Sequence, residues 1–365
     1  MIEQSTYCSL ATSGWDDRSK KMCCLVDLPF YKNHTEMHKD QTVKNLVNDL
    51  ANGKKNNACK ECWKLESNGI ISMRQQSLKN EGGPKAKNIL EQEAKHKKLK
   101  YLVLDSGLQC NFACRTCGPH SSTGHTKEWI ARTGKEWKQR PISFDAIVSE
   151  DLSSVTNIEV LGGEPFVNLN HLEIVDKVKD NKLYWLTYTT NGSVKLNKEI
   201  YDRFKNFKAV HICLSIDAIG KQFEYIRTLG KWEKVKNNIQ NLLLLKKQLK
   251  HLSVANHITV SALNLFYLDP LIEYLNSIGI TSDFTFCEQP DEYSLRVFTD
   301  KELQVIREQF SKSKSCKPVF EHLQSVTHSP YARKQFFEAV EFTKNYRQLD
   351  YKEYLPKLFD TVMHS

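Results

Sequence analysis

A chain of 365 residues with 40% hydrophobic side chains can form one large domain or two to three smaller ones, each with an apolar core. No apolar run reaches the length of a membrane span, because the four leucines of 242–245 are followed at once by two lysines. The first residues, MIEQSTYCSLATSGWDD, lack the basic start and apolar stretch of a signal peptide, so we expect a cytoplasmic protein without a membrane partner.

The formal charge of +9 is concentrated in two stretches, 85–100 and 246–251. A basic chain suits an anionic substrate or a nucleic acid. These stretches have no interleaved aromatic residues, and the sequence has no recognisable RNA-binding module. We therefore expect solvated helix faces, and a nucleic-acid partner is disfavoured.

Eleven cysteines are many for a compartment that keeps thiols reduced, and clusters at short spacings there indicate metal binding rather than disulfides. Eight of the cysteines fall into two groups, Cys8, Cys23, Cys24, Cys59 and Cys62 near the start and Cys110, Cys114 and Cys117 further on. Cys213, Cys287 and Cys316 are isolated. Because Cys213 and Cys287 lie in apolar runs, we expect both to be buried core thiols.

Residues 1–82 contain no long periodic helix except around 41–51, and they are rich in cysteine, asparagine and glycine. This composition predicts a small module held together by metal. Residues 83–98 are a charged helical stretch that suits a linker helix, and residues 291–365 predict a polar, helical C-terminal extension.

Residues 99–290 alternate between short apolar runs and helix-like segments. Strands are expected at 99–107, 157–165, 183–193, 209–220, 253–264 and 281–290. Helices are expected at 122–137, 143–153, 169–180, 197–206, 231–250 and 268–278. This alternation predicts an α/β fold with a parallel sheet and crossover helices, either an open sheet or a partial (β/α)6 barrel.

Ligands of such folds gather at the carboxyl ends of the strands. The chemistry is therefore expected at Cys110–Cys117, Gly162–Pro165, Thr189–Gly192, Ser215–Asp217, Asn264 and Glu288. The sequence identifies no catalytic acid or base, although Glu288, Asp217, His120 and Tyr188 are candidates by position.

The spacing C-x3-C-x2-C places Cys110, Cys114 and Cys117 directly after the first strand of the alternating pattern. A four-iron cluster takes one thiolate per iron, so three cysteines leave one iron open to a ligand. A zinc site with His120 as the fourth ligand is the alternative. The position after a strand of a βα pattern disfavours zinc.

This motif resembles that of the radical S-adenosylmethionine (SAM) superfamily. The resemblance implies a [4Fe-4S] cluster whose open iron is chelated by SAM. One electron from the cluster then cleaves SAM into methionine and a 5′-deoxyadenosyl radical, which removes a hydrogen atom from the substrate.

Other residues strengthen the resemblance. The motif GGEP, Gly162, Gly163, Glu164 and Pro165, resembles the segment that holds the SAM amino group. In the peptide-modifying branch, residues matching Ser215, Asp217 and Arg227 lie at the SAM site, with the arginine paired to the SAM carboxylate, and Asn264 resembles a further SAM contact. From the residues alone, Asp217 also suits a turn cap, Arg227 a surface ion pair and Asn264 a loop.

One position departs from the family pattern. Thr116 precedes the third cysteine, where relatives usually carry an aromatic residue that lies against the adenine. Phe112, Phe286 or another side chain is then needed for that contact.

The N-terminal group resembles the twitch (SPASM-like) domains that bind an auxiliary [4Fe-4S] cluster. Cys59 and Cys62 are followed by Glu66, Gly69, Ser72 and Arg74, as in the last part of such modules. The resemblance implies a cluster held by Cys8, Cys23, Cys59 and Cys62, with Cys24 as the alternative to Cys23. A zinc ribbon made of the same cysteines stays open.

The resemblances together imply a radical SAM oxidoreductase or peptide-modifying enzyme that acts on a peptide or small molecule. An electron donor such as flavodoxin or ferredoxin would supply its electrons. An RNA-modifying radical SAM enzyme and a non-catalytic zinc or iron–sulfur protein are the alternatives.

Overall fold

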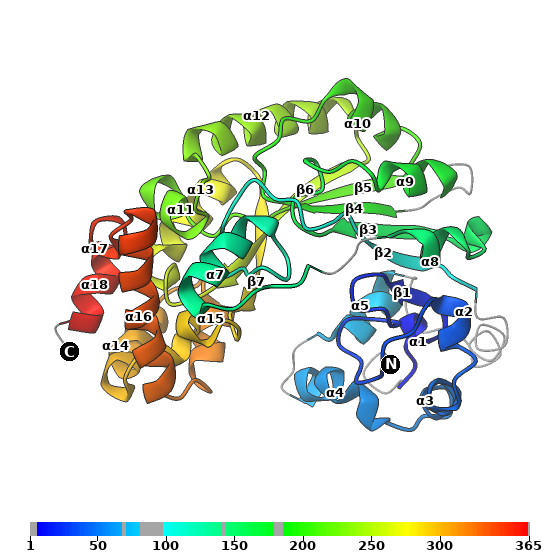
Figure 1. Ribbon diagram of the computed structural model, residues 1–365, viewed down its shortest axis with the longest axis horizontal. Helices are drawn as coiled ribbons and strands as arrows, with labels where there is room; N and C mark the ends of the chain where they lie inside the picture. The colour runs from blue at the N-terminus through cyan, green and yellow to red at the C-terminus, as the bar shows by residue number, and fades with distance from the viewer. Residues whose placement is uncertain (1–5, 68–70, 81–97, 140–142, 179–184, 364–365) are drawn as a thin grey trace.

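The computed structural model describes residues 6–67, 71–80, 98–139, 143–178 and 185–363. Its centre is a seven-stranded parallel sheet whose strands pair in chain order (Figure 1). The strands are β1 (Gly14–Asp16), β2 (Tyr101–Asp105), β3 (Asn157–Leu161), β4 (Trp185–Thr190), β5 (Ala209–Leu214), β6 (Leu252–Val260) and β7 (Thr281–Phe286). The six strands expected from the sequence are confirmed as β2 to β7, and so is the α/β class.

The seventh strand, β1, was not expected. It comes from the N-terminal module and pairs in parallel with β2, with Trp15 opposite Leu102. The module is therefore joined to the edge of the sheet beside the strand that leads into Cys110. Curvature toward a partial barrel stays a prediction, as do the domain boundaries at 82, 98 and 290.

Helices connect the strands, and α9, α10 and α12 lie along one face of the sheet (Figure 1). The connecting helices are α7 (Thr126–Thr133), α8 (Asp145–Val148), α9 (Leu172–Val178), α10 (Lys198–Phe204), α11 (Gly220–Ile226), α12 (Trp232–Gln248) and α13 (Leu268–Ser277). All lie where the sequence predicts a helix except α11, which was missed. Its first residue, Gly220, has a φ of +58°, so the helix begins at a turn that breaks the apolar pattern.

The N-terminal module is built from short helices. They are α1 (Ser9–Ser13), α2 (His34–Met37), α3 (Gln41–Ala51), α4 (Lys60–Ser67) and α5 (Met73–Asn80). The expected helix around 41–51 is confirmed as α3, which Asp40 caps by accepting a hydrogen bond from the Thr42 N–H. The linker helix expected at 83–98 lies almost entirely outside the described residues.

The C-terminal extension is helical, as expected. It contains α14 (Asp300–Phe310), α15 (Lys317–Leu323), α16 (Pro330–Arg347), α17 (Tyr351–Tyr354) and α18 (Pro356–Met363). The helices pack beside α7 and α11, on the side of the sheet away from the N-terminal module (Figure 1). None of the helices in the described part of the chain has the length and apolar character needed to cross a bilayer.

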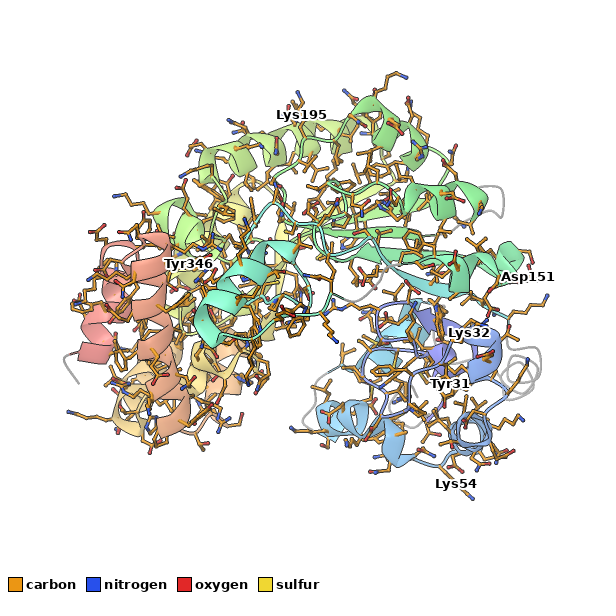
Figure 2. The ribbon with its side chains drawn as sticks, in the orientation of Figure 1. Tyr31, Lys32, Lys54, Asp151, Lys195 and Tyr346 are labelled. Atoms are coloured by element: carbon orange, nitrogen blue, oxygen red, sulfur yellow. The ribbon has the colours of Figure 1, made fainter. Side chains whose placement is uncertain are left out.

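The positive charge is spread over separate outer surfaces. Lys54 of the N-terminal module and Lys195 near α12 are both exposed, and they point outward at distant places in the molecule (Figure 2). Residues 85–97 of the first basic stretch lie outside the described residues.

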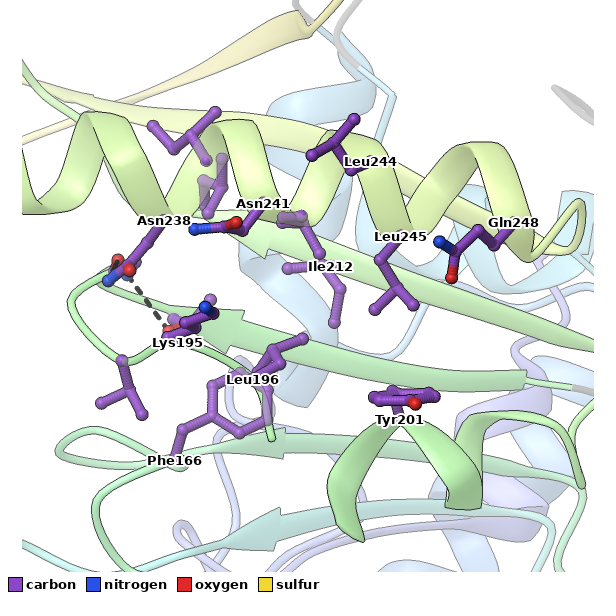
Figure 3. A pocket seen from close by; sticks show the side chains of 16 residues that line it. Phe166, Lys195, Leu196, Tyr201, Ile212, Asn238, Asn241, Leu244, Leu245 and Gln248 are labelled. Carbon is purple, nitrogen blue, oxygen red and sulfur yellow. Dashed lines mark hydrogen bonds between the residues drawn. The ribbon is translucent and has the colours of Figure 1, made fainter. Parts of the chain in front are cut away.

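The main apolar core lies between the helices and the buried face of the sheet. Val210, Ile212 and Leu214 of β5 are buried on this face. A cavity of about 210 Å³ remains between α12 and strands β4 and β5, where Tyr201 and Leu245 are among its mostly apolar lining (Figure 3). Because no cysteine lines this cavity, we do not assign the cluster chemistry to it.

Candidate functional site

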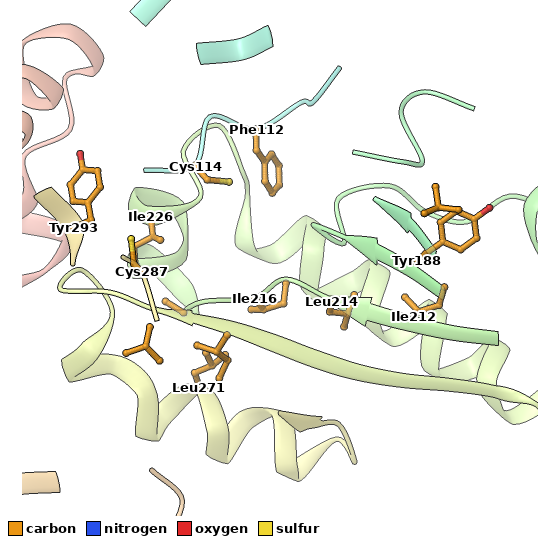
Figure 4. Close-up of a cluster of buried hydrophobic side chains, with 14 of the residues drawn as sticks. Phe112, Cys114, Tyr188, Ile212, Leu214, Ile216, Ile226, Leu271, Cys287 and Tyr293 are labelled. Carbon is orange, nitrogen blue, oxygen red and sulfur yellow. The ribbon is translucent and has the colours of Figure 1, made fainter. Parts of the chain in front are cut away.

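The three-cysteine loop follows β2 and is fixed to the core on both sides. The Ala113 N–H donates to the Thr228 carbonyl over 2.9 Å, and the Arg115 N–H donates to the Ile226 carbonyl over 2.8 Å. Phe112 and Cys114 are themselves buried among core side chains (Figure 4). The loop is thus held at the carboxyl end of the sheet, where the sequence analysis placed it.

The three thiols form one electrostatic unit. Burial, with a smaller contribution from the charge of Cys114, raises the pKa of Cys110 to about 11 and that of Cys117 to about 12. No cysteine forms a disulfide. A cationic cluster would offset the cost of gathering three thiolates. The donor set therefore fits an iron–sulfur cluster with one thiolate per iron.

Within the described ranges, no three or more His, Cys, Asp or Glu side chains are grouped to hold a metal ion. His120, the fourth ligand of the zinc alternative, is exposed. In a four-iron cluster each thiolate binds a different iron, so the three thiols need not converge on one point as the ligands of a single ion do.

Arg227 lies directly beside the cysteine loop. Its Nη1 is 3.7 Å from the Cys114 Sγ, and its Nη2 is 2.7 Å from the Asp217 Oδ2. Asp217 is held in turn by the Thr259 N–H, which donates to its Oδ1 over 2.9 Å. The Arg227 side chain is only 12% exposed, so it is not a surface ion pair of the ordinary kind. Its contact with SAM stays a prediction.

The two glycines of GGEP pack against the cysteine loop. A Cβ at Gly163 would lie 2.3 Å from the Gln109 carbonyl oxygen, and Gly162 has a φ of +142°. The Gly163 N–H donates to the Gly107 carbonyl over 2.6 Å. These glycines are therefore needed for close packing of GGEP against the backbone that leads into the cysteine loop, and not for contact with a ligand alone.

Glu164 is fully buried and links GGEP to the end of β4. Its carboxylate accepts hydrogen bonds from the Thr190 hydroxyl, from the Asn191 N–H, both over 2.7 Å, and from the Phe166 N–H over 3.2 Å. Burial raises the pKa of Glu164. Both carboxylate oxygens already have protein donors, so the predicted pairing with the SAM ammonium would add to these bonds. Pro165 is buried beside it.

Ser215 and Asn264 occupy different kinds of position. The Ser215 N–H donates to the Thr190 carbonyl over 2.8 Å, and the residue is half-buried. Asn264 is fully buried and donates to the carbonyls of Asp217 and Thr259, both over 3.0 Å. Asn264 therefore braces the turn that carries Asp217, and its contact with SAM stays a prediction.

The sequence model of the Radical SAM superfamily matches residues 106–274, the segment that contains every one of these groups. Residues 106–274 form a radical SAM domain. The match begins in the cysteine loop and ends in α13, so it leaves out the N-terminal module and the C-terminal extension.

Two curated relatives were found, both named "Probable GTP 3′,8-cyclase". The protein of Methanocaldococcus jannaschii is 27% identical over 172 residues, which are 47% of this chain and 53% of the relative. That of Methanococcus vannielii is 31% identical over 139 residues, 38% of this chain and 43% of the relative. The chain thus spans about half the length of the curated relatives it matches or less.

Among solved structures, "Native anSMEcpe with bound AdoMet" is similar to this chain with a TM-score of 0.40 and 18% identity. The match covers 64% of each chain.

Outside the cluster loop, the radical SAM domain carries a polar sheet face that the sequence analysis missed. On the face turned away from the main core, Glu159, His211, Cys213, His257 and Asp283 are half-buried or exposed. Parallel sheets are usually buried on both faces, so this open polar face is a candidate substrate surface. The signal lay in polar residues at alternate positions of the strands, as in His257 and Thr259 of β6.

A histidine–carboxylate pair lies on this open face. The His257 Nδ1 is 2.5 Å from the Asp283 Oδ1, and its Nε2 is 3.0 Å from the Thr285 hydroxyl. The hydrogen bond to Asp283 raises the pKa of His257. The pair is an additional candidate for acid–base work, beside the four residues proposed from strand position.

The expectation that Cys213 is a buried core thiol was wrong. It is half-buried on the open face, because strand residues alternate between faces and its neighbours Ile212 and Leu214 take the core side. Cys287 and Cys316 are buried.

The remaining candidates named from the sequence have ordinary surroundings. Tyr188 is buried, with its hydroxyl 3.0 Å from the His171 Nε2, and Glu288 is exposed. Phe112 is buried and packs edge-to-face on Phe223. Phe286 is stacked on His322 with ring centroids 3.6 Å apart.

The N-terminal cysteines come together from three separate segments. Cys8, Cys23, Cys59 and Cys62 line one small cavity, whereas Cys24 is exposed and does not line it. Burial, with smaller contributions from other cysteines of the group, raises the pKa of Cys8 and of Cys59 to about 12.

The residues that follow Cys62 support this cavity. Arg74 pairs with Glu66, with the Arg74 Nη2 2.7 Å from the Glu66 Oε2, and the Arg74 side chain is 2% exposed. Ser72 donates a hydrogen bond to the same carboxylate over 2.5 Å. Gly69, the other residue of the resemblance, lies outside the described residues.

Proposed function

We propose that the protein is a radical SAM enzyme whose [4Fe-4S] cluster is held by Cys110, Cys114 and Cys117. The observation that carries this proposal is the three-cysteine loop, fixed at the strand ends of a segment that matches the superfamily. When bound, the cluster and SAM supply the 5′-deoxyadenosyl radical that removes a hydrogen atom from the substrate.

The residues around the loop have distinct roles in this proposal. Arg227, oriented by Asp217, binds the SAM carboxylate, because a guanidinium suits a bidentate contact. The GGEP backbone and Glu164 bind the SAM amino group. Ser215, a half-buried residue directly after β5, completes the contacts, while Asn264 keeps Asp217 in place.

We further propose that Cys8, Cys23, Cys59 and Cys62 hold an auxiliary [4Fe-4S] cluster in a twitch-like module. The shared cavity and its support by Arg74 and Glu66 favour this arrangement. Four protein ligands would leave no iron open to a substrate. A cluster ligated in this way suits electron transfer rather than substrate binding.

The experiment that tests the main proposal measures SAM cleavage. Anaerobically reconstituted and reduced protein should form 5′-deoxyadenosine slowly, even without substrate. Replacing Cys110, Cys114 and Cys117 together by Ala should abolish the product. Replacing Cys8, Cys59 and Cys62 should leave it largely intact, and equal loss from both sets would refute the division of roles.

The substrate is proposed only by class, as a small molecule or peptide. The names of the two curated relatives make GTP the first compound to test. Acceleration of 5′-deoxyadenosine formation by GTP, with consumption of GTP, would support a cyclase. No response to GTP would turn the search to peptides, because Ser215, Asp217 and Arg227 resemble residues of the peptide-modifying branch.

A further inference from the structure

The C-terminal extension reaches the cysteine loop through buried polar contacts. Arg115 lies between Cys114 and Cys117 in the loop and is 5% exposed. Its Nη1 donates a hydrogen bond over 2.7 Å to the hydroxyl of Thr343, which lies on α16. The loop and α16 are more than 200 positions apart in the sequence, so only the tertiary fold brings them together.

A second residue of α16 joins the same network through Glu128 of α7. Arg115 donates to both oxygens of Glu128, over 2.9 and 3.2 Å. Arg347, near the end of α16, donates to the Glu128 Oε2 from Nε over 3.0 Å and from Nη2 over 2.6 Å. One carboxylate is thus shared by two guanidinium groups.

This network carries an excess positive charge next to the loop. Burial opposes ionisation of Glu128, but the two arginines keep its pKa below the ordinary value. The adjacent His125 adds no charge at neutral pH, because burial lowers its pKa to about 4. The sum over Arg115, Glu128 and Arg347 is one positive charge, and the Arg115 Nη2 lies 3.4 Å from the Ala113 carbonyl oxygen, within the cysteine loop.

We propose that α16 is a positioning element for the cluster: Thr343 and Arg347 hold Arg115 against the loop, and the buried charge raises the cluster's reduction potential. This rests on the proposed assignment of the cluster to Cys110, Cys114 and Cys117. It gives the C-terminal extension a role that neither the superfamily match nor the relatives supply.

The physical reason is electrostatic. One-electron reduction adds a negative charge to the cluster, and a positive charge in a poorly solvated site stabilises it more than it would in water. Replacing Arg347 removes one positive charge and leaves Arg115 and Glu128 as a neutral pair. This network then retains no unpaired charge, which favours a folded variant.

The experiment is a redox titration of the full-length reconstituted protein, followed by the electron paramagnetic resonance signal that changes when SAM is added. Arg347→Gln should lower the midpoint potential by about 59 mV, equivalent to a tenfold change in the one-electron equilibrium constant. Arg347→Lys should restore most of the potential. Thr343→Val should give a smaller shift in the same direction.

The matched control is Arg203→Gln, since Arg203 also pairs with a carboxylate, Asp176, but on the outer helices α9 and α10. It should leave the potential unchanged. An unchanged potential in Arg347→Gln with full iron content would overturn the inference. Loss of iron from this cluster alone, in a folded variant rescued by Arg347→Lys, would support positioning. A wild-type protein without a SAM-sensitive signal would instead refute the proposed function.

Discussion

The two cysteine groups are built in different ways. Cys110, Cys114 and Cys117 come from one loop of eight residues after β2. Cys8, Cys23, Cys59 and Cys62 come from three segments that meet only when α1, the following loop and α4 pack together. The first group depends on local chain geometry, and the second depends on tertiary assembly.

Arg74 beside the N-terminal group and Arg227 beside the Cys110–Cys117 group are each paired with a carboxylate, but the two arginines differ in what they can reach. Arg74 is 2% exposed, and Glu66 engages both its Nε and its Nη2. Arg227 is 12% exposed and contacts the Cys114 Sγ directly. The N-terminal cysteine group supported by Arg74 is therefore called the closed site. The Cys110–Cys117 group, where Arg227 can contact a ligand, is called the open site.

The largest expected effect is on iron content, and it tests whether both groups hold clusters. Reconstituted protein should contain about eight irons, from two four-iron clusters. Replacing Cys59 and Cys62 by Ala should reduce this to about four. Iron near four in the wild type, with stoichiometric zinc, would show that the N-terminal group is a zinc site. Cys24→Ser is the matched control and should change nothing, because Cys24 does not line the cavity.

The next effect concerns the open site. Arg227→Ala should weaken SAM binding about 10- to 100-fold, since a charge-assisted hydrogen bond contributes about 1.5–3 kcal/mol. Arg227→Lys should recover part of this, because an ammonium cannot make two parallel bonds. Equilibrium dialysis with labelled SAM gives the dissociation constant.

The structure adds a necessary control to this test. Arg227→Ala leaves Asp217 buried without its partner, and this alone can destabilise the fold. The double variant Arg227→Ala with Asp217→Asn removes that charge. An unchanged dissociation constant in either variant, with full iron content, would assign the carboxylate contact to another group.

The third effect tests the closed site through its support. Glu66→Gln removes the carboxylate that both Arg74 and Ser72 contact, and breaking a buried pair typically costs about 3–5 kcal/mol. The N-terminal module should therefore unfold at lower urea concentration and lose its iron, while SAM cleavage persists. Asp27→Asn is the control, because its pair with Lys60 is exposed and should contribute no measurable stability.

Much of the fold was predictable because the signal is local. A short apolar run followed by turn residues marks each of the strands β2 to β7, and C-x3-C-x2-C lies in a single loop. By contrast, β1 has only three residues and exists through its pairing with β2. No local pattern indicates such a strand.

The same reasoning explains what was missed at the site. The network of Arg115, Glu128 and Arg347 joins residues far apart in the chain, so no spacing rule could identify it. The open face was missed because the apolar runs were assessed for strand character and not for which face each residue takes. Cys213 is an example. Its buried neighbours Ile212 and Leu214 indicated a core position, but Cys213 itself lies on the open face.

The smallest effect concerns the open face and the pair of His257 and Asp283. The pKa of His257 is raised in the folded protein, so the pair stabilises the fold fully below the unfolded histidine pKa of about 6.5. This stabilisation is lost as the pH rises through the folded pKa. The lowered pKa of Asp283 keeps the carboxylate ionised until the solution is more acidic.

Asp283→Asn should therefore reduce stability to urea at pH 5.5 more than at pH 8.5. The difference should be small, because the Asp283 side chain is 76% exposed. A Ser253→Ala variant, which removes the hydroxyl beside His211 on the same face, should show no such pH dependence. Equal destabilisation by Asp283→Asn at both pH values would mean that the pair is not ionised, and would leave the open face without a charged acid–base group at this position.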